Sequence, residues 1–241
     1  MKKYAVCIVG QFRTFHQDNV SSNILAAIQK IKPQSDVFFV FGEQPVTELD
    51  KISRQFNPIN ISYYNSEKFG RVDDRMHGVH MAYGWKKLYS TILDQEKLNG
   101  YQYEIIVKLR PDVMLRAYFH DKMPVETKKA TVYSDYLGGC GGTDADCLND
   151  MSAIITRPAM KSYLNDFYDD FYKDNTFTKL QCPECKLGWT LNNCNVYKGV
   201  AKFGDTIIRP GQTPVDVDRH WQTNCQAQKE LILGATRVDF L

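Results

Sequence analysis

The stretch of sequence that decides the fold is Tyr-Glu-Ile-Ile-Val-Lys-Leu-Arg-Pro-Asp-Val, residues 103–113. Its first part, residues 103–109, is largely apolar and predicts a core strand of a sheet. Arg110, Pro111 and Asp112 follow immediately. Because proline fixes the turn, the carboxylate of Asp112 would stand at the carboxyl end of a central strand, where an α/β enzyme holds a metal or a sugar hydroxyl. The alternative is a structural ion pair between Arg110 and Asp112.

The residues before this stretch alternate between strand-like and helix-like segments at short intervals. Such alternation is typical of an α/β protein with a mainly parallel central sheet flanked by helices. Expected strands are residues 4–9, 37–41 and 60–64, and expected helices are residues 19–31, 46–56 and 78–98.

The second half of the chain has a less regular pattern. Expected strands are residues 130–133, 152–156 and 207–208, and expected helices run from Pro158 to about Tyr172 and from Pro183 to about Asn193. Because no repeat or linker interrupts the chain, we predict one domain over residues 1–241. Residues 1–113 would form its nucleotide-binding half and residues 114–241 its acceptor and catalytic half.

Composition and charge exclude several classes of protein. The chain has 241 residues, 43% of them hydrophobic, and 30 Lys and Arg balance 28 Asp and Glu, for a net charge of +2. This balance argues against a polybasic nucleic-acid binder, so no nucleic-acid partner is expected. No apolar run reaches the roughly 18 residues of a membrane span, and residues 4–9 are too short for the apolar core of a signal peptide. We therefore predict a cytoplasmic protein without a membrane span.

Seven cysteines are an odd number in a chain without a recognisable signal peptide, so reduced thiols are expected. Cys182 and Cys185 have the CxxC spacing of a zinc or redox site. A structural zinc site needs two further ligands, and the remaining cysteines offer no second pair with that spacing. Ordinary thiols and a zinc or redox role are both left open.

The loop after the first expected strand, residues 10–14, is the other candidate binding segment. Ligands of parallel α/β sheets bind beyond the carboxyl ends of the strands, and a first loop can offer backbone N–H groups to a nucleotide. Gly10 permits close approach, and Arg13 can pair with phosphate. Neither GxGxxG nor GxxxxGK[ST] is present, so a dinucleotide site or a P-loop is not supported. A tight turn with a surface arginine is the alternative.

Taken in order along the chain, five segments resemble GT-A-type glycosyltransferases of capsular and surface-glycan pathways, which occur in bacteria and in large DNA viruses. These segments are Gly-Gln-Phe-Arg-Thr at 10–14, Gly-Trp-Lys-Lys-Leu at 84–88, residues 103–113, Asn-Asp-Met-Ser-Ala-Ile at 149–154 and Pro-Glu at 183–184. The resemblance spans about residues 4 to 210. It implies a hexosyl- or pentosyltransferase with a GT-A (Rossmann-like) fold that moves a sugar from a UDP- or GDP-linked donor to a glycan hydroxyl.

The resemblance also implies a donor site at the carboxyl edge of the sheet. Gly10, Gln11 and Arg13 would cradle base, ribose or phosphate, and Lys86 would contact the diphosphate. Arg110-Pro111-Asp112 stands where the family usually has Asp-x-Asp. Asp112 is then the only metal carboxylate carried over, for Mn²⁺ or Mg²⁺, while Arg110 can itself offset diphosphate charge. Metal dependence is left open at this point.

Further residues would serve the acceptor side and the metal. Asp150 is the preferred general base and Glu184 the alternate, although an acid in the first turn of a helix also has a simple electrostatic explanation. Asp144 and Asp146 follow a glycine-rich loop and are interpreted as an acceptor-side or lid segment, with a surface hairpin as the alternative. His220 could complete the metal site.

Two other functions fit the same pattern. A sugar nucleotidyltransferase shares the sheet, although it would normally carry a glycine- and lysine-rich segment after the first strand. A non-catalytic nucleotide-sugar or glycan-binding module is compatible with the arginine in place of the first acid.

Overall fold

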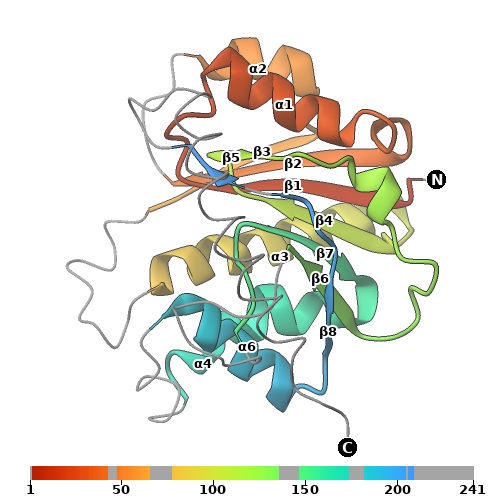
Figure 1. The fold of residues 1–241 in the computed structure, drawn as a ribbon, viewed down its shortest axis with the longest axis vertical. Coiled ribbons are helices and arrows are strands. Elements are labelled where there is room, and N and C mark those ends of the chain that lie inside the picture. Colours follow the sequence, from red (N-terminus) through yellow and green to blue (C-terminus); the bar gives the residue numbers. More distant parts are fainter. Residues whose placement is uncertain are drawn as a thin grey trace, which may run out of the picture.

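The computed structural model describes residues 2–42, 48–65, 78–135, 147–173, 182–204 and 206–208. A seven-stranded mixed sheet forms its centre, with the strand order β3-β2-β1-β4-β7-β6-β8 (Figure 1). The strands are β1 (Tyr4–Gly10), β2 (Ser35–Gly42), β3 (Asn60–Tyr64), β4 (Ile105–Leu109), β6 (Thr131–Ser134), β7 (Ser152–Thr156) and β8 (Tyr197–Val200). The predicted α/β class with a mainly parallel sheet is confirmed.

Strands β1, β2, β3 and β4 pair in parallel, whereas β7 runs antiparallel to both β4 and β6. Because β1 and β4 are neighbours, Gly10 and Arg110 leave the sheet at the same edge. This arrangement brings the two loops predicted to bind a ligand together, although about a hundred residues separate them in the chain.

Helices cover both faces of the sheet (Figure 1). Helices α1 (Asp18–Ile28) and α2 (Leu49–Phe56) lie on one face, and α3 (Val79–Asn99), α4 (Phe167–Asp170) and α6 (Pro183–Asn193) lie on the other. Side chains of a strand alternate between faces. Accordingly, Ala5, Cys7 and Val9 of β1 join the apolar cluster under α3, while Val6 and Ile8 join the one under α1.

Several predicted boundaries differ from the structure. Helix α1 ends at Ile28, three residues before the predicted end, and a short 3₁₀ helix at Lys32–Gln34 leads into β2. The helix predicted from Pro158 to Tyr172 is divided into a 3₁₀ turn at Arg157–Ala159, a π-helix at Ser162–Asp166 and α4. The first part of the helix predicted at 46–56 lies outside the described residues.

The sequence pattern missed two strands. β8 packs parallel to β6 at the edge of the sheet, and β5 (Val113–Met114) pairs with β9 (Thr206–Ile207) in a separate two-stranded sheet. Both are short, and their pairing depends on distant partners rather than on local pattern. Among the described residues, no helix is long and apolar enough to cross a membrane.

Gly84 of α3 offers a test of how helix and sheet edge fit together. A Cβ at this position would lie 2.8 Å from Cε1 and 2.9 Å from Cζ of Tyr64. We expect Gly84→Ala to lower the free energy of unfolding by about 1–3 kcal/mol through overpacking, although alanine normally favours a helix. Urea denaturation measures the change, and Ser90→Ala on the exposed side of the same helix serves as the control. If Gly84→Ala were as stable as the wild type or more stable, the close packing of Gly84 against the Tyr64 ring would be contradicted.

Candidate active site

A pocket of about 80 Å³ lies at the carboxyl ends of β1 and β4. Its wall combines the loop after β1, the end of β3, the start of α3 and the turn after β4. The lining residues are Val9, Gly10, Gln11, Arg13, Tyr64, His80, Met81, Trp85, Arg110 and Asp112. Five of the predicted donor-side residues, namely Gly10, Gln11, Arg13, Arg110 and Asp112, are therefore together in one pocket.

The backbone of the first loop is adapted to this position. Gly10 has φ of 145°, and a Cβ there would lie 3.0 Å from Cδ of Pro111, so the two loops are in close contact only because residue 10 is glycine. Arg13 has φ of 37°, in the left-handed region that non-glycine residues rarely adopt. Such conformations cluster at binding and active sites because the surrounding structure holds the backbone against the local cost.

Asp112 is the centre of a charged cluster. Its Oδ1 accepts from Nε of Arg110 at 2.9 Å, and its Oδ2 accepts from Nη2 of Arg110 and from Nη1 of Arg13, both at 3.0 Å. Nε of Arg13 donates in turn to Oε1 of Gln11 at 2.9 Å. The Asp112 side chain is 2% exposed, while the side chain of Arg13 is 42% exposed. One buried carboxylate thus orients two guanidinium groups, one of which faces solvent.

The charges of this cluster stabilise one another. Burial alone would raise the pKa of Asp112, but the hydrogen bonds and charges of Arg110 and Arg13 hold it below its usual value. Burial alone would lower the pKa of Arg110, and the hydrogen bond and charge of Asp112 raise it, with smaller effects from the charges of Asp150 and Glu184. At neutral pH the cluster therefore contains a carboxylate and two guanidinium cations.

Asp150 lies next to this cluster, and the negative charge of Glu184 also acts on Arg110. Oδ2 of Asp150 is 3.7 Å from Nη1 of Arg110, and Lys108 donates to the backbone carbonyl of Asp150. The segment containing Asp150 is tied to the first turn of α6, since the backbone N–H of Leu148 donates to the carbonyl of Glu184 at 3.2 Å. The structure thus brings both predicted general-base candidates towards the arginine that lines the pocket.

Lys108 packs against Trp85, one of the residues that line the pocket. Both side chains are buried, and Nζ of Lys108 lies 4.3 Å from the centroid of the Trp85 ring. The second arginine on Asp112 is Arg13, which is 99 residues away in sequence. Tyr64, His80 and Met81 were not predicted as lining residues. The position of Tyr64 at the end of a parallel strand was the available signal for the first of them.

Lys86, which was predicted to contact the diphosphate, lies outside this pocket. Its Nζ pairs with Oδ1 of Asp169 at 2.7 Å and lies 4.7 Å from the Tyr168 ring, on the side of α3 that faces α4, and it does not line the pocket. Asp144, Asp146 and His220, predicted for the lid and the metal site, lie outside the described residues.

The surroundings of Asp112 do not fit a divalent cation. Both of its oxygens already accept hydrogen bonds from guanidinium groups, and no cluster of three acids, histidines or cysteines forms around it in the described part of the chain. Mn²⁺ and Mg²⁺ normally take several oxygen ligands, and two fixed cations nearby oppose their binding.

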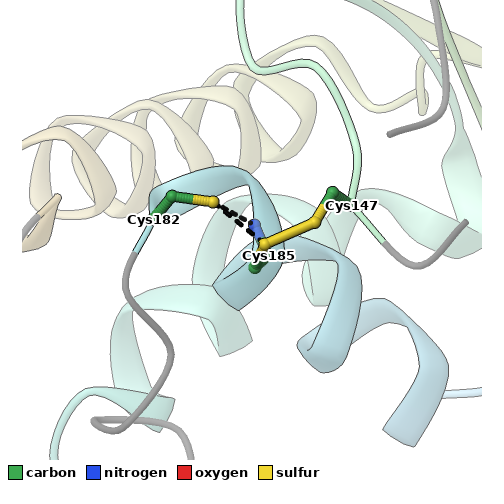
Figure 2. A group of neighbouring side chains, drawn as sticks. All are labelled: Cys147, Cys182 and Cys185. Atoms are coloured by element: carbon green, nitrogen blue, oxygen red, sulfur yellow. Dashed lines mark hydrogen bonds between the residues drawn. A yellow bond between two sulfur atoms is a disulfide. The ribbon is translucent and has the colours of Figure 1, made fainter. Parts of the chain in front are cut away.

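Cysteines gather at the first turn of α6. Cys147 and Cys185 form a disulfide, and the sulfur of Cys182 lies 3.0 Å from that of Cys185 (Figure 2). The expectation of reduced thiols is wrong for Cys147 and Cys185, because the fold places the loop before Asp150 against the CxxC turn. Cys7 and Cys194 are free.

Comparison with known proteins identifies the fold. No protein-family model matches the sequence, and no curated protein matches it. Two crystal structures of LgtC match the structure. The galactosyltransferase LgtC in complex with donor and acceptor sugar analogues has a TM-score of 0.51 at 12% identity, over 81% of this chain and 72% of that chain. An active-site mutant of LgtC gives a TM-score of 0.56 at 10% identity, over 82% and 72% of the two chains.

At such low identity these similarities establish the fold alone. The chain has the mixed α/β fold of GT-A glycosyltransferases, as the family resemblance implied.

Proposed function

We propose that the chain is a glycosyltransferase that moves a hexosyl or pentosyl group from a UDP- or GDP-linked sugar to a glycan hydroxyl. The observation that carries the proposal is the pair of arginines held on buried Asp112 in a pocket at the carboxyl ends of β1 and β4. In doubly wound α/β proteins this edge of the sheet is where nucleotides bind. LgtC, which shares the fold, has been crystallised with donor and acceptor sugar analogues.

Arg13 and Arg110 are suited to the diphosphate of the donor. Guanidinium groups bind phosphate oxygens through paired, charge-assisted hydrogen bonds. Asp112 and Gln11 together use only Nε and one N–H of Nη1 of Arg13, so the other N–H groups of this exposed guanidinium can bind a ligand. Because the cations are already oriented, little reorganisation is needed when negative charge develops on the leaving diphosphate. Gly10 and Gln11 would contact the nucleotide beside them, and a nucleotide sugar would occupy the small pocket with only part of its length.

Asp150 is proposed as the general base, with Glu184 as the alternate. In an inverting transfer the acceptor hydroxyl gives its proton to the carboxylate while its oxygen bonds to the anomeric carbon of the sugar. The bond from that carbon to the diphosphate breaks at the same time, and its electron pair leaves with the diphosphate oxygen. Asp150 is available for this role because its carboxylate lies 3.7 Å from Nη1 of Arg110, at the edge of the sheet where the donor is proposed to bind.

The remaining assignments extend this proposal. Residues 1–113 supply the donor-side groups and residues 114–241 supply Asp150 and Glu184, in line with one domain of two functional halves. Asp144 and Asp146 as acceptor or lid residues, His220 as a metal ligand, a surface-glycan product and a cytoplasmic location remain predictions.

Nucleotide-sugar binding tests the proposal directly. The purified protein is expected to gain thermal stability with at least one member of a panel of UDP- and GDP-sugars, and to transfer or slowly hydrolyse that sugar. Replacing Arg13 with alanine should weaken donor binding about 10- to 150-fold, since a hydrogen bond to a charged group contributes about 1.5–3 kcal/mol. Isothermal titration calorimetry measures the change.

Lys97→Ala is the matched control, because it removes one positive charge from the exposed far end of α3, about 24 Å along the helix from Met81. If Arg13→Ala and Lys97→Ala changed donor affinity equally, Arg13 would not be a donor-binding residue. Failure to bind any nucleotide sugar would overturn the proposed function.

A further inference from the structure

Three cysteine sulfurs converge where the loop before Asp150 meets helix α6 (Figure 2). Cys182 precedes the first residue of α6, Cys185 lies in its first turn, and Cys147 reaches them from a segment 38 residues earlier than Cys185. All three sulfurs lie within 4.8 Å of one another, with Cys147 buried and the other two half-buried.

The local backbone favours thiolates at this position. The N–H of Cys185 donates to Sγ of Cys182 at 3.2 Å, and the N-terminal end of an 11-residue helix carries partial positive charge. Both effects lower the cost of a deprotonated sulfur. The CxxC turn thus holds two sulfurs in a fixed geometry, and the third sulfur comes from elsewhere in the chain.

We infer that Cys147, Cys182 and Cys185 form a zinc site in the reduced protein. Zinc bound by thiolates has Zn–S distances of about 2.3 Å and tetrahedral geometry, which places the sulfurs about 3.8 Å apart. Sulfurs that already lie within 4.8 Å reach this geometry by small side-chain shifts. Soft thiolate ligands select zinc over magnesium or manganese. Three thiolates leave one coordination position, which a water molecule can fill.

The disulfide and the zinc site are alternative states of the same sulfurs. Reduction of the Cys147–Cys185 bond by a dithiol transfers two electrons to it and converts the dithiol into its own disulfide. When zinc binds, the thiols of Cys147, Cys182 and Cys185 each release their proton to solvent. Oxidation by a disulfide reagent such as oxidised glutathione reverses the change and releases the metal.

The disulfide and the zinc site would each link the segment that contains Asp150 to the turn that contains Glu184, the two proposed catalytic residues. Asp150 follows Cys147 by three residues, Glu184 lies between Cys182 and Cys185, and the Leu148 N–H already donates to the Glu184 carbonyl. The zinc site itself does not depend on the proposed function, and only its consequence for Asp150 and Glu184 rests on it.

Metal analysis of the full-length protein, reduced with a phosphine and dialysed against zinc without chelator, tests the inference. About one zinc per chain is expected in the wild type, and Cys147→Ser, Cys182→Ser and Cys185→Ser should each lose most of it. Cys194→Ser, which removes a free, exposed thiol, should keep its zinc. Asp112→Asn should also keep it, which separates this site from the nucleotide pocket.

Cobalt substitution covers the case in which a serine variant fails to fold. Reduced wild-type protein with Co²⁺ should show a thiolate-to-cobalt charge-transfer band and the visible spectrum of a tetrahedral site, and oxidised glutathione should abolish both. Absence of zinc and of that band in the reduced wild type would overturn the inference, as would equal zinc loss in Cys194→Ser or selective loss in Asp112→Asn. These results do not depend on whether a nucleotide sugar binds.

Discussion

Replacing Asp112 with asparagine is expected to abolish sugar transfer and to lower the free energy of unfolding by about 2–3 kcal/mol. An amide offers one acceptor oxygen, and its NH₂ group would face the donor N–H groups of Arg110 and Arg13. Breaking a fully buried ion pair costs about 3–5 kcal/mol. The smaller value applies here because Arg13 is partly exposed and Arg110 retains Asp150 at 3.7 Å. The fold should persist, since such a loss is a fraction of a typical stability.

Urea denaturation and a transfer assay measure the two effects, with Asp121→Asn as the control. Asp121 pairs with His120 on the surface, so its substitution should change stability by less than about 1 kcal/mol. Wild-type transfer activity in Asp112→Asn would show that the Asp112 carboxylate has no role in transfer. Unchanged stability would contradict the inference that the ion pairs of Asp112 with Arg110 and Arg13 stabilise the fold.

The pH dependence of the Asp112→Asn effect follows from the same cluster. Although burial opposes it, the arginines hold the pKa of Asp112 below 3.8, its ordinary value. The carboxylate therefore contributes stability that is present above pH 3.8 and is lost as the pH falls through the folded-state pKa. The stability difference between wild type and Asp112→Asn should narrow below that pH.

Replacing Asp150 with asparagine is expected to lower kcat about 10²- to 10⁴-fold while donor affinity changes little, because a general base contributes by about this factor. The amide keeps the shape of the side chain but cannot accept the proton of the acceptor hydroxyl. Steady-state kinetics with saturating donor, together with calorimetry of donor binding, separate the two effects. Glu184→Gln is the matched comparison.

Comparing Asp150→Asn with Glu184→Gln identifies which of the two carboxylates acts as the general base. A larger loss of kcat in Glu184→Gln than in Asp150→Asn would transfer the role to Glu184. A loss of donor affinity in Asp150→Asn equal to its loss of kcat would mean that Asp150 positions Arg110 and does not accept the proton.

Local pattern was enough to predict most of the fold. The apolar runs that became β1, β2 and β4 have the length and continuity of strands buried on both faces, and a 21-residue amphipathic segment became α3. Short edge strands such as β8, with two of its four residues exposed, carry too little pattern to be recognised. The π-helix before α4 was missed for a similar reason, since its sequence has ordinary helical spacing.

The candidate site was predictable only where its residues leave parallel strands. Gly10 ends β1, and Arg110 and Asp112 follow β4. The carboxyl ends of these parallel neighbours meet at one edge of the sheet. Lys86 shows the limit of this reasoning, because a helix offers several faces and packing against α4 directs this side chain to Asp169.

The sequence by itself determined an α/β chain whose first loop and Arg-Pro-Asp turn share one edge of a parallel sheet. Only the tertiary structure decided that Asp112 binds Arg13 as well as Arg110, and that Cys147 joins Cys182 and Cys185. The physical reason is the range of the interactions. Strand and helix patterns arise from neighbours a few residues apart, whereas ion pairs and sulfur clusters depend on side chains that packing brings together from distant parts of the chain.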